Sequence, residues 1–306
     1  MRALVTGGAG FVGSHLAARL AHDGWEVVAT VRPGGSRWRL EALGVADDVT
    51  ITSVDLADRD ATVALAGGVA PDVVFLGAAA RSRATAAERA ATAAVNATSG
   101  QWLVDALPER CRAVVRLGSS TEYARSDGPM DETTPLRPRG FFGATKAAGS
   151  LLVTAAAAER GVRAVVLRAF QVYGPLDHSD RLVPRALRAA RTGEVLPLTG
   201  PGLRRDWVFV ADVVEACVRA AHADHLPAGQ VLNVGTGRQV ANEELVEDVR
   251  RVTGRPVTVA EGACAPREWD TGSWVCDPSL ARHLLGWDAK AALEEGLSRC
   301  WDAERQ

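Results

Sequence analysis

The chain has 306 residues, of which 47% are hydrophobic and 24% are charged. This balance is typical of a folded globular protein with one large or two coupled domains, and it excludes an intrinsically disordered chain. The formal net charge of −2 argues against broad, non-specific binding of nucleic acid. Because no apolar run reaches about 18 residues and no separate signal segment precedes Arg2–Thr6, we expect a cytoplasmic protein without a membrane span.

Short apolar runs alternate with Ala-rich helical patterns through the first half of the chain. The apolar runs predict buried strands at Arg2–Thr6, Glu26–Val31, Val49–Val54, Asp72–Leu76, Ala113–Leu117 and Arg163–Leu167. The helical patterns fall at Phe11–Asp23, Arg59–Ala66, Ala84–Leu107 and Ala144–Glu159. This alternation predicts an α/β fold of the Rossmann type, a doubly wound parallel sheet covered by helices on both faces.

The pattern changes after Gly174, where Pro, Gly and Arg interrupt the chain. Further helices are predicted at Leu182–Thr192, Glu243–Thr253 and Leu293–Ala303, with a late strand at Val231–Val234. We interpret this part as a smaller C-terminal α/β lobe that binds the substrate. The expected division gives residues 1–172, with about 205–232, to the sheet domain, and about 173–204 and 233–306 to the smaller lobe.

A glycine-rich turn joins the first predicted strand to the first predicted helix. Gly7, Gly10 and Gly13 form a G-x-x-G-x-x-G pattern, in which the glycines permit a tight turn, the approach of a pyrophosphate and close packing of helix on strand. Phe11 and Val12 begin a helix whose free N–H groups face such a phosphate. The context predicts a dinucleotide site at these five residues, against the alternative of a glycine-rich turn without a ligand.

The end of the second strand bears on which dinucleotide binds. NAD sites usually carry Asp or Glu there, to accept a hydrogen bond from the ribose 2′-hydroxyl, whereas this chain has Arg32. A guanidinium can pair with a 2′-phosphate, so Arg32 favours NADP(H) over NAD(H) as the cofactor. The alternative is an ordinary surface arginine, because the chain uses Arg almost throughout and has only two lysines, Lys146 and Lys290.

Several further segments follow in a fixed order: Asp55-Leu56, Leu76–Ala80, Asn96, Leu167–Pro175, Arg205–Val213, Asn233–Gly237 and Leu285–Trp287. With the glycine turn, they make the chain resemble the extended short-chain dehydrogenase/reductase family, in its nucleotide-sugar-modifying branch, over nearly the whole length. The resemblance implies an NAD(P)-dependent enzyme whose smaller lobe binds a nucleoside-diphosphate sugar. It also implies that Asp55 and Leu56 contact the adenine and that Ala78 and Ala79 line the cofactor.

The resemblance implies a set of substrate contacts as well. Arg205 corresponds to the residue that holds the substrate diphosphate, and Arg181 and Arg267 are candidates to assist it. Bidentate pairing of Arg with phosphate is the physical reason to expect arginine there. Gln171 stands where the family has Asn and is expected to bond to the sugar or a phosphate.

The family's catalytic pattern is present in an altered form. Its Ser/Thr element corresponds to the segment after the fifth sheet strand, where Ser120 takes the hydrogen-bonding role with Thr121 as the alternative. Glu122 falls where nucleotide-sugar dehydratases carry a catalytic Glu. In the Tyr-x-x-x-Lys element Lys146 is retained, and the resemblance implies that it also binds the cofactor, through the nicotinamide ribose. Phe142 occupies the position of the tyrosine and cannot exchange a proton.

Three functions remain open at this point. The leading hypothesis is NADPH-dependent reduction of a nucleotide-bound 4-keto-6-deoxysugar, in deoxysugar biosynthesis, with Glu122 or a water bound by Lys146 as the proton source. The alternatives are a 4,6-dehydratase or epimerase with recycled cofactor, and a catalytically degenerate binder of cofactor or sugar. The resemblance also implies a homodimer formed through the helices at 84–107 and 144–159. The scattered cysteines predict neither a metal site nor a disulfide framework.

Overall fold

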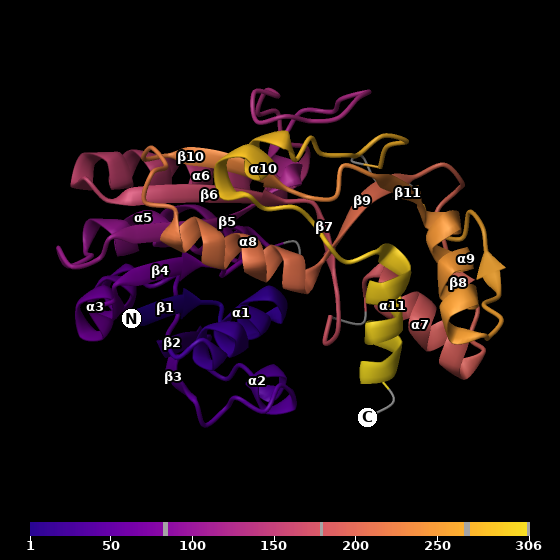
Figure 1. The fold of residues 1–306 in the computed structure, drawn as a ribbon, viewed down its shortest axis with the longest axis horizontal. Coiled ribbons are helices and arrows are strands. Elements are labelled where there is room, and N and C mark those ends of the chain that lie inside the picture. The colour runs from indigo at the N-terminus through magenta and orange to yellow at the C-terminus, as the bar shows by residue number, and fades with distance from the viewer. Residues whose placement is uncertain (82–84, 178–179, 266–269, 305–306) are drawn as a thin grey trace.

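A seven-stranded, all-parallel sheet forms the centre of the computed structural model, which describes residues 1–81, 85–177, 180–265 and 270–304. In spatial order the strands are β10 (Gln230–Val234), β6 (Arg163–Ala169), β5 (Ala113–Ser119), β4 (Val73–Leu76), β1 (Arg2–Thr6), β2 (Glu26–Val31) and β3 (Val49–Ser53). Figure 1 shows this sheet with helices packed on it. The predicted doubly wound Rossmann-type fold is confirmed.

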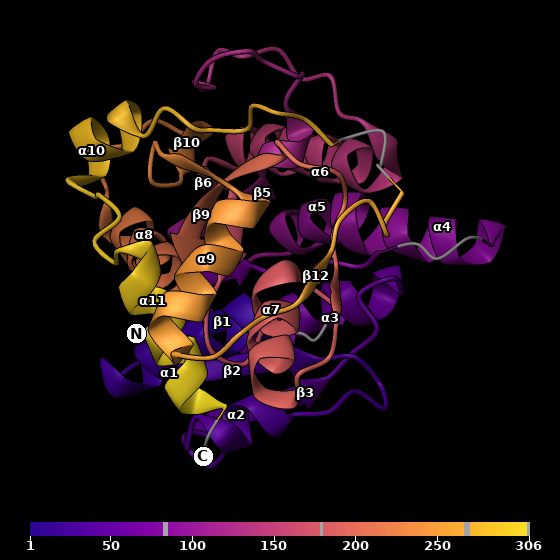
Figure 2. The ribbon, with the colours of Figure 1, turned by 90° about the vertical axis from the view of Figure 1, so that its right-hand side faces the viewer.

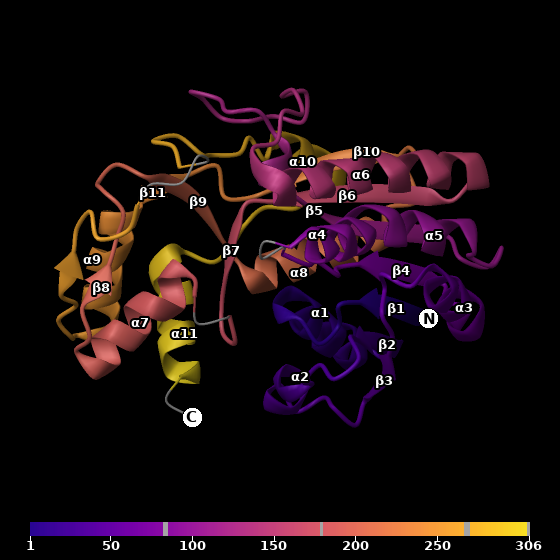
Figure 3. The ribbon, with the colours of Figure 1, turned by 180° about the vertical axis from the view of Figure 1, so that it is seen from behind.

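Helices cover both faces of this sheet, because each central strand is apolar on both sides. On β1, Ala3 and Val5 pack toward α1 (Phe11–His22) and α8 (Val210–His222), whereas Leu4 packs toward the opposite face. That opposite face is covered by α3 (Arg59–Val69), α5 (Ser99–Asp105) and α6 (Gly140–Arg160), which Figure 3 shows from behind. A short helix, α2 (Trp38–Ala42), lies between β2 and β3 in the chain.

The smaller lobe stands beside the carboxyl end of the sheet (Figures 1 and 2). Its strands β7 (Gln171–Tyr173), β9 (Arg204–Phe209) and β11 (Gln239–Ala241) form a three-stranded sheet, and β8 (Leu196–Pro197) pairs with β12 (Val259–Ala260). Three helices pack around them: α7 (Leu182–Thr192), α9 (Asn242–Thr253) and α11 (Leu293–Ala303).

The packing differs from the expected division of the chain in two places. Residues 205–209, expected in the sheet domain, belong to β9 and so to the three-stranded sheet of the smaller lobe. The second difference lies near the C-terminus. The helix α10 (Ser279–Leu285) lies against β10 and α8, and its Ala281 and the following Trp287 are buried in the core of the large sheet. Trp287 also donates from Nε1 to the carbonyl of Asp212 on α8, at 2.8 Å. The chain therefore returns to the sheet domain after building most of the smaller lobe.

The predicted helix at Ala84–Leu107 is interrupted. Thr85 and Glu88 form a capping box that starts α4 (Ala86–Ala93), and a π-helical turn, η1 (Ala94–Thr98), separates α4 from α5. The predicted helix at Ala144–Glu159 is α6, which begins four residues earlier, at Gly140. By length and composition α6 could cross a membrane, but half of its most apolar window is buried inside the protein. We therefore interpret α6 as a core helix.

Candidate functional site

The glycine turn is packed too tightly for any side chain. Gly7 has φ +68°, and an added Cβ would come closer than 3.0 Å to the Ala78 backbone of the neighbouring β4 loop. A Cβ on Gly13 would come closer than 3.0 Å to the Gly7 carbonyl oxygen. Gly10 precedes α1, and no side chain caps the helix there. The first N–H groups of α1 are thus presented at the carboxyl edge of the sheet, which fits a phosphate-bearing cofactor.

The other predicted cofactor residues lie along the same edge. Arg32 follows β2 and is exposed, and Asp55 and Leu56 follow β3, with Asp55 exposed and Leu56 buried. Ala78 donates its N–H to Thr6 Oγ1 at 3.3 Å, which ties the loop after β4 to the start of the glycine turn, and Ala79 follows it, exposed. Because the carboxyl ends of parallel strands meet at one edge, the fold brings these residues together.

Asn96 holds the loop after β4 in place through side-chain hydrogen bonds to the loop backbone. Its side chain accepts from the N–H of Ala80 at 2.7 Å, and its Nδ2 donates to the Ala80 carbonyl and to Thr145 Oγ1 on α6, both at 2.9 Å. Asn96 is 1% exposed and belongs to the π-helical turn η1. The turn therefore couples the β4 loop to the helix that carries Phe142 and Lys146.

Lys146 is buried, and its Nζ donates to the Leu117 carbonyl on β5. Burial, with a smaller contribution from nearby Arg116, lowers the pKa of Lys146 to about 7. Phe142 lies one helical turn before it on α6, half-buried, with the Arg81 guanidinium 5.3 Å from its ring centre. One end of the site thus combines an amine with a lowered proton affinity and an aromatic ring without a hydroxyl group.

Two hydroxyl groups follow β5, in the 3-10 turn η2 (Ser120–Glu122). Ser120 is buried, and its Oγ accepts from the indole Nε1 of Trp274 at 2.9 Å. The Ser120 hydroxyl hydrogen remains available to a ligand oxygen. Thr121 is less buried, and its Oγ1 lies 2.8 Å from Ser119 Oγ.

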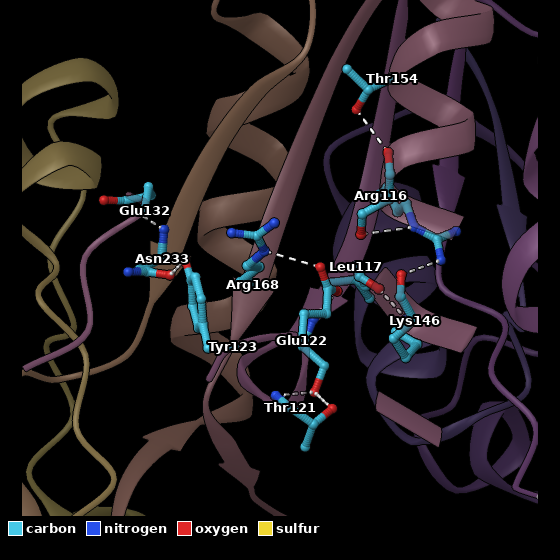
Figure 4. Close-up of polar contacts among 12 residues, drawn as sticks. Arg116, Leu117, Thr121, Glu122, Tyr123, Glu132, Lys146, Thr154, Arg168 and Asn233 are labelled. Atoms are coloured by element: carbon cyan, nitrogen blue, oxygen red, sulfur yellow. Dashed lines mark hydrogen bonds and ion pairs between the residues drawn. The ribbon is translucent and has the colours of Figure 1, made fainter. Parts of the chain in front are cut away.

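Glu122 and Tyr123 are held by partners within the protein (Figure 4). The Glu122 carboxylate is fully buried, forms an ion pair with Arg168 at 3.0 Å and accepts from the Ser119 N–H at 2.8 Å. The Tyr123 hydroxyl donates to Asn233 Oδ1 at 2.7 Å, and burial raises the pKa of Tyr123 to about 12. Both side chains therefore bond to buried groups of the protein itself, and we interpret their contacts as structural.

The predicted substrate residues do not form one cluster. Gln171 on β7 and Arg205 on β9 belong to the same three-stranded sheet, and Arg205 forms an ion pair with Asp270 at 3.0 Å. Arg181 lies elsewhere, at the start of α7, 3.5 Å from Asp177 and with its guanidinium 5.8 Å from the ring centre of Phe11. Arg267 lies outside the described residues.

Sequence reasoning missed Trp274 and Arg116, and it included Arg168 in a motif without assigning it a role. Trp274 gives no local signal, because it is 154 residues from its partner Ser120. Arg116 does give one, since it is a charged residue inside a run that otherwise predicts a strand buried on both faces. Among the residues with described positions, no group of three or more His, Cys, Asp or Glu side chains is placed to hold a metal ion.

Comparisons with known proteins agree with this geometry. Residues 3–235 match the model of the NAD dependent epimerase/dehydratase family. A UDP-glucose 4-epimerase from Mycolicibacterium smegmatis is 32% identical over 98% of this chain and 97% of its own length. A dTDP-glucose 4,6-dehydratase from the same organism is 30% identical over 97% of this chain and 91% of its own.

Among solved structures, MoeE5 in complex with UDP-glucose and NAD superposes with a TM-score of 0.85 at 32% identity, covering 100% of this chain and 99% of that one. Membership of one family therefore explains why the glycine turn, the strand order and the lysine of α6 occur together. The chain belongs to the NAD dependent epimerase/dehydratase family, within the extended short-chain dehydrogenases/reductases that include the nucleotide-sugar epimerases and dehydratases.

Proposed function

We propose that this protein is a nucleotide-sugar epimerase: it binds a nicotinamide dinucleotide across the glycine turn and inverts a hydroxyl-bearing carbon of a nucleoside-diphosphate sugar. The observation that carries the proposal is the buried Lys146 at the same sheet edge as the glycine turn. A bound nicotinamide supplies reversible acceptance of hydride from the sugar carbon. The name of one relative, UDP-glucose 4-epimerase, supports this class of reaction, and the UDP-glucose and NAD bound to MoeE5 support these classes of ligand.

The contacts of Glu122 favour epimerisation over dehydration. Removing water from the sugar requires an acid or base beside the ring in addition to the hydride acceptor. Glu122 is the candidate for that role by resemblance, but its carboxylate is fully buried against Arg168. We therefore assign Glu122 a structural role, and Ser120 the role of donating a hydrogen bond to the sugar oxygen, with Thr121 beside it.

We propose that the sugar nucleotide lies between the sheet edge and the smaller lobe. Gln171 and Arg205 share one small sheet there, and Arg205 reaches a diphosphate when its ion pair with Asp270 opens. Arg181, over the Phe11 ring, is suited to a phosphate at the junction of the two lobes. Arg267 keeps its sequence-based assignment as an assisting residue.

A second candidate is NADPH-dependent reduction of a nucleotide-bound 4-keto-6-deoxysugar, and it is favoured by Arg32. Arg32 is exposed at the end of β2, where a 2′-phosphate would lie, and no carboxylate follows in that strand. An Arg32→Asp variant should lose affinity for NADP(H) relative to NAD(H) in calorimetry. Equal effects on both cofactors would remove the argument for NADP.

The two candidates differ in what happens to the cofactor. The purified protein is incubated with UDP- and dTDP-hexoses and, separately, with a dTDP-4-keto-6-deoxyhexose, each with NAD and NADP in both oxidation states. An epimerase changes the sugar configuration, seen by NMR, with no net change in nicotinamide absorbance. A reductase consumes reduced cofactor in a 1:1 ratio with the ketone. If neither cofactor binds in a calorimeter, both candidates fail.

We also propose that two copies associate through α6. Leu151 is 60% exposed and Leu152 is 37% exposed, on the face of α6 that points away from the sheet. Apolar side chains of this size on one helix face mark a contact surface. A Leu151→Glu variant should run as a monomer in light scattering where the unmodified chain is a dimer. Val195→Glu, at a 55% exposed residue of the smaller lobe, is the matched control and should leave the mass unchanged.

A further inference from the structure

Arg116 is a cation buried in the middle of the central strand β5. It is 3% exposed, and no carboxylate of the described residues forms an ion pair with it. Its guanidinium donates instead to the Asn96 carbonyl at 2.6 Å, to the Lys146 carbonyl at 3.4 Å and to Ser150 Oγ at 3.4 Å. Burying a charge among neutral acceptors is costly, so its presence under the site calls for a functional reason.

The surroundings of Arg116 are shaped to receive it. A Cβ on Gly149 of α6 would come closer than 3.0 Å to Arg116 Nη2 and to the Asn96 carbonyl oxygen, so only glycine leaves room there. The Asn96 carbonyl belongs to the π-helical turn η1, where the ordinary helical pairing is shifted. The Arg116 guanidinium therefore links η1, whose Asn96 bonds to the loop after β4, to the turn of α6 that carries Lys146.

Positive charge dominates the surroundings of Lys146. The charged groups that act on Lys146 are Arg116 on β5 and, more weakly, Glu122 of η2, whose carboxylate is already paired with Arg168 (Figure 4).

The other elements that pack on α6 add no compensating negative charge near Lys146. The turn η1 carries no charged side chain, and α5 carries one, Asp105, which is exposed and bonded to Gln101. The helix α4 carries Glu88, which is exposed and accepts from the Thr85 N–H at 3.0 Å in the capping box. Arg81, and Arg89 of α4, lie over the Phe142 and Phe141 rings at the start of α6. Burial and, to a smaller extent, Arg116 lower the pKa of Lys146 to about 7. The negative charge of Glu122 raises this pKa, but by less than the other two effects lower it.

We propose that Lys146 is the acid–base group of this site, performing the proton transfer that Phe142 cannot, and that Arg116 is the positioning residue that holds Lys146 in a state able to do so. This inference rests on the proposed function. In the oxidising half of the reaction the neutral Lys146 amine would take the proton of the sugar hydroxyl. A nicotinamide dinucleotide held across the glycine turn would supply the two-electron acceptor that the change from hydroxyl to carbonyl requires. In the reducing half the Lys146 ammonium would return its proton to the oxygen.

The lysine content of the chain allows a direct test. With only Lys146 and Lys290 present, metabolic labelling with ¹³Cε-lysine gives two side-chain signals, and Lys290→Arg assigns them without touching the site. Lys290 is exposed and serves as the internal reference. We expect the Lys146 signal to titrate near neutral pH in the protein without ligands. A Lys146 signal that titrates only at alkaline pH, as a solvated lysine amine does, would overturn the inference and leave the proposed epimerase untouched.

A variant then tests the role of Arg116. Arg116→Met removes the charge at similar volume, and we expect the Lys146 titration to move up by about one unit or more, with the acid limb of the pH–turnover profile moving with it. If Arg116→Met does not fold, Gly149→Ala displaces the guanidinium while leaving every charge in place, and it should shift the Lys146 signal as well. An unmoved titration in a folded variant contradicts the positioning role.

Turnover separates the proton role from the binding role. Lys146→Arg keeps a positive charge that cannot be given up, because arginine stays protonated. We expect it to bind the cofactor within a few-fold of the unmodified protein and to lose about 10²–10⁴-fold in kcat. Wild-type turnover by Lys146→Arg would overturn the inference. Absence of turnover in the unmodified protein, with a normal Lys146 titration, would instead overturn the proposed function on which it rests.

Discussion

In the family pattern a tyrosine and a lysine act together in the proton transfer, whereas here Phe142 has no hydroxyl group and we assign the transfer to Lys146 alone. If Lys146 already transfers the proton, a new hydroxyl one turn away adds a second donor rather than the only one. General acid–base catalysis is worth about 10²–10⁴-fold, so a site that lacked it would respond strongly to Phe142→Tyr. We expect Phe142→Tyr to raise kcat by no more than about tenfold, measured by sugar NMR at several pH values.

The matched control for this variant is Phe141→Tyr. Phe141 is its neighbour on α6, 39% exposed, and receives the same hydroxyl on the solvent side. It should leave kcat as it was. A rise of more than about 10²-fold in Phe142→Tyr alone would mean that the site has no working acid–base group of its own, and that the protein is a cofactor or sugar binder.

A Glu122 variant tests whether this carboxylate, which stands where the dehydratases carry a catalytic Glu, has a structural or a catalytic role here. Glu122 is fully buried and paired with Arg168, which is itself 5% exposed. Removing one partner of a buried ion pair leaves the other uncompensated, so Glu122→Gln should lower the free energy of unfolding by about 3 kcal/mol in urea titrations. Glu41→Gln, in the exposed pair with Arg37, should change it by less than about 1 kcal/mol. Unchanged stability in Glu122→Gln, with turnover abolished, would return Glu122 to a catalytic role.

At the scale of elements, the strongly patterned segments were predictable and the interrupted ones were not. The strands Arg2–Thr6 and Glu26–Val31, and the helices Leu182–Thr192 and Leu293–Ala303, have the predicted bounds, because the hydrophobic pattern marks each of them. A glycine also marks the end of the first strand and of the helix Leu182–Thr192. The break at η1 escapes prediction, since a π-helical turn depends on which carbonyls find other partners, here Asn96 with Arg116.

The short strands β7, β9 and β11 escape for a related reason. They contain Gln, Arg and Asp residues that break the apolar pattern, and tertiary pairing alone makes them strands. Resemblance nevertheless placed Arg205 and Gln171 in motifs, and both motifs lie in this small sheet. The contact of Trp274 with Ser120 needed the fold itself, because it joins distant parts of the chain.

Two helical glycines respond oppositely to the same substitution. Gly149→Ala puts a methyl group against Arg116 and Asn96, so the helix must shift, and we expect a loss of about 1–3 kcal/mol in the free energy of unfolding. Gly67, in α3, faces open space, and Gly67→Ala should stabilise by about 0.5–1 kcal/mol because alanine loses less backbone entropy in a helix. Urea titration of both variants measures the two signs. A stabilising Gly149→Ala would mean that the Arg116 cradle is looser than the structure shows.

At the scale of the whole molecule, one of the connections between the two lobes is the segment that follows β7. The His15 ring on α1 donates from Nε2 to the Pro175 carbonyl at 2.9 Å, and Arg39 of α2 donates to the Leu176 carbonyl at 2.9 Å. Two helices of the sheet domain, α1 and α2, therefore hold the segment that leads from β7 into the smaller lobe. Since the substrate is proposed to lie between the lobes, the stability of this junction bears on the geometry of the site.

His15 makes the junction sensitive to acid. Burial, with help from the Arg39 charge, lowers the pKa of His15 below its ordinary value of 6.5, although the Pro175 carbonyl opposes the shift. As the pH falls through 6.5, the unfolded chain takes up a proton that the folded chain refuses, so the free energy of unfolding decreases toward acid pH. Denaturant titrations of the unmodified protein and of His15→Gln between about pH 7 and pH 5 should therefore show a steeper acid loss in the unmodified protein. Parallel curves would mean that His15 titrates alike in the folded and unfolded states, and that the acid sensitivity of the junction lies in other groups.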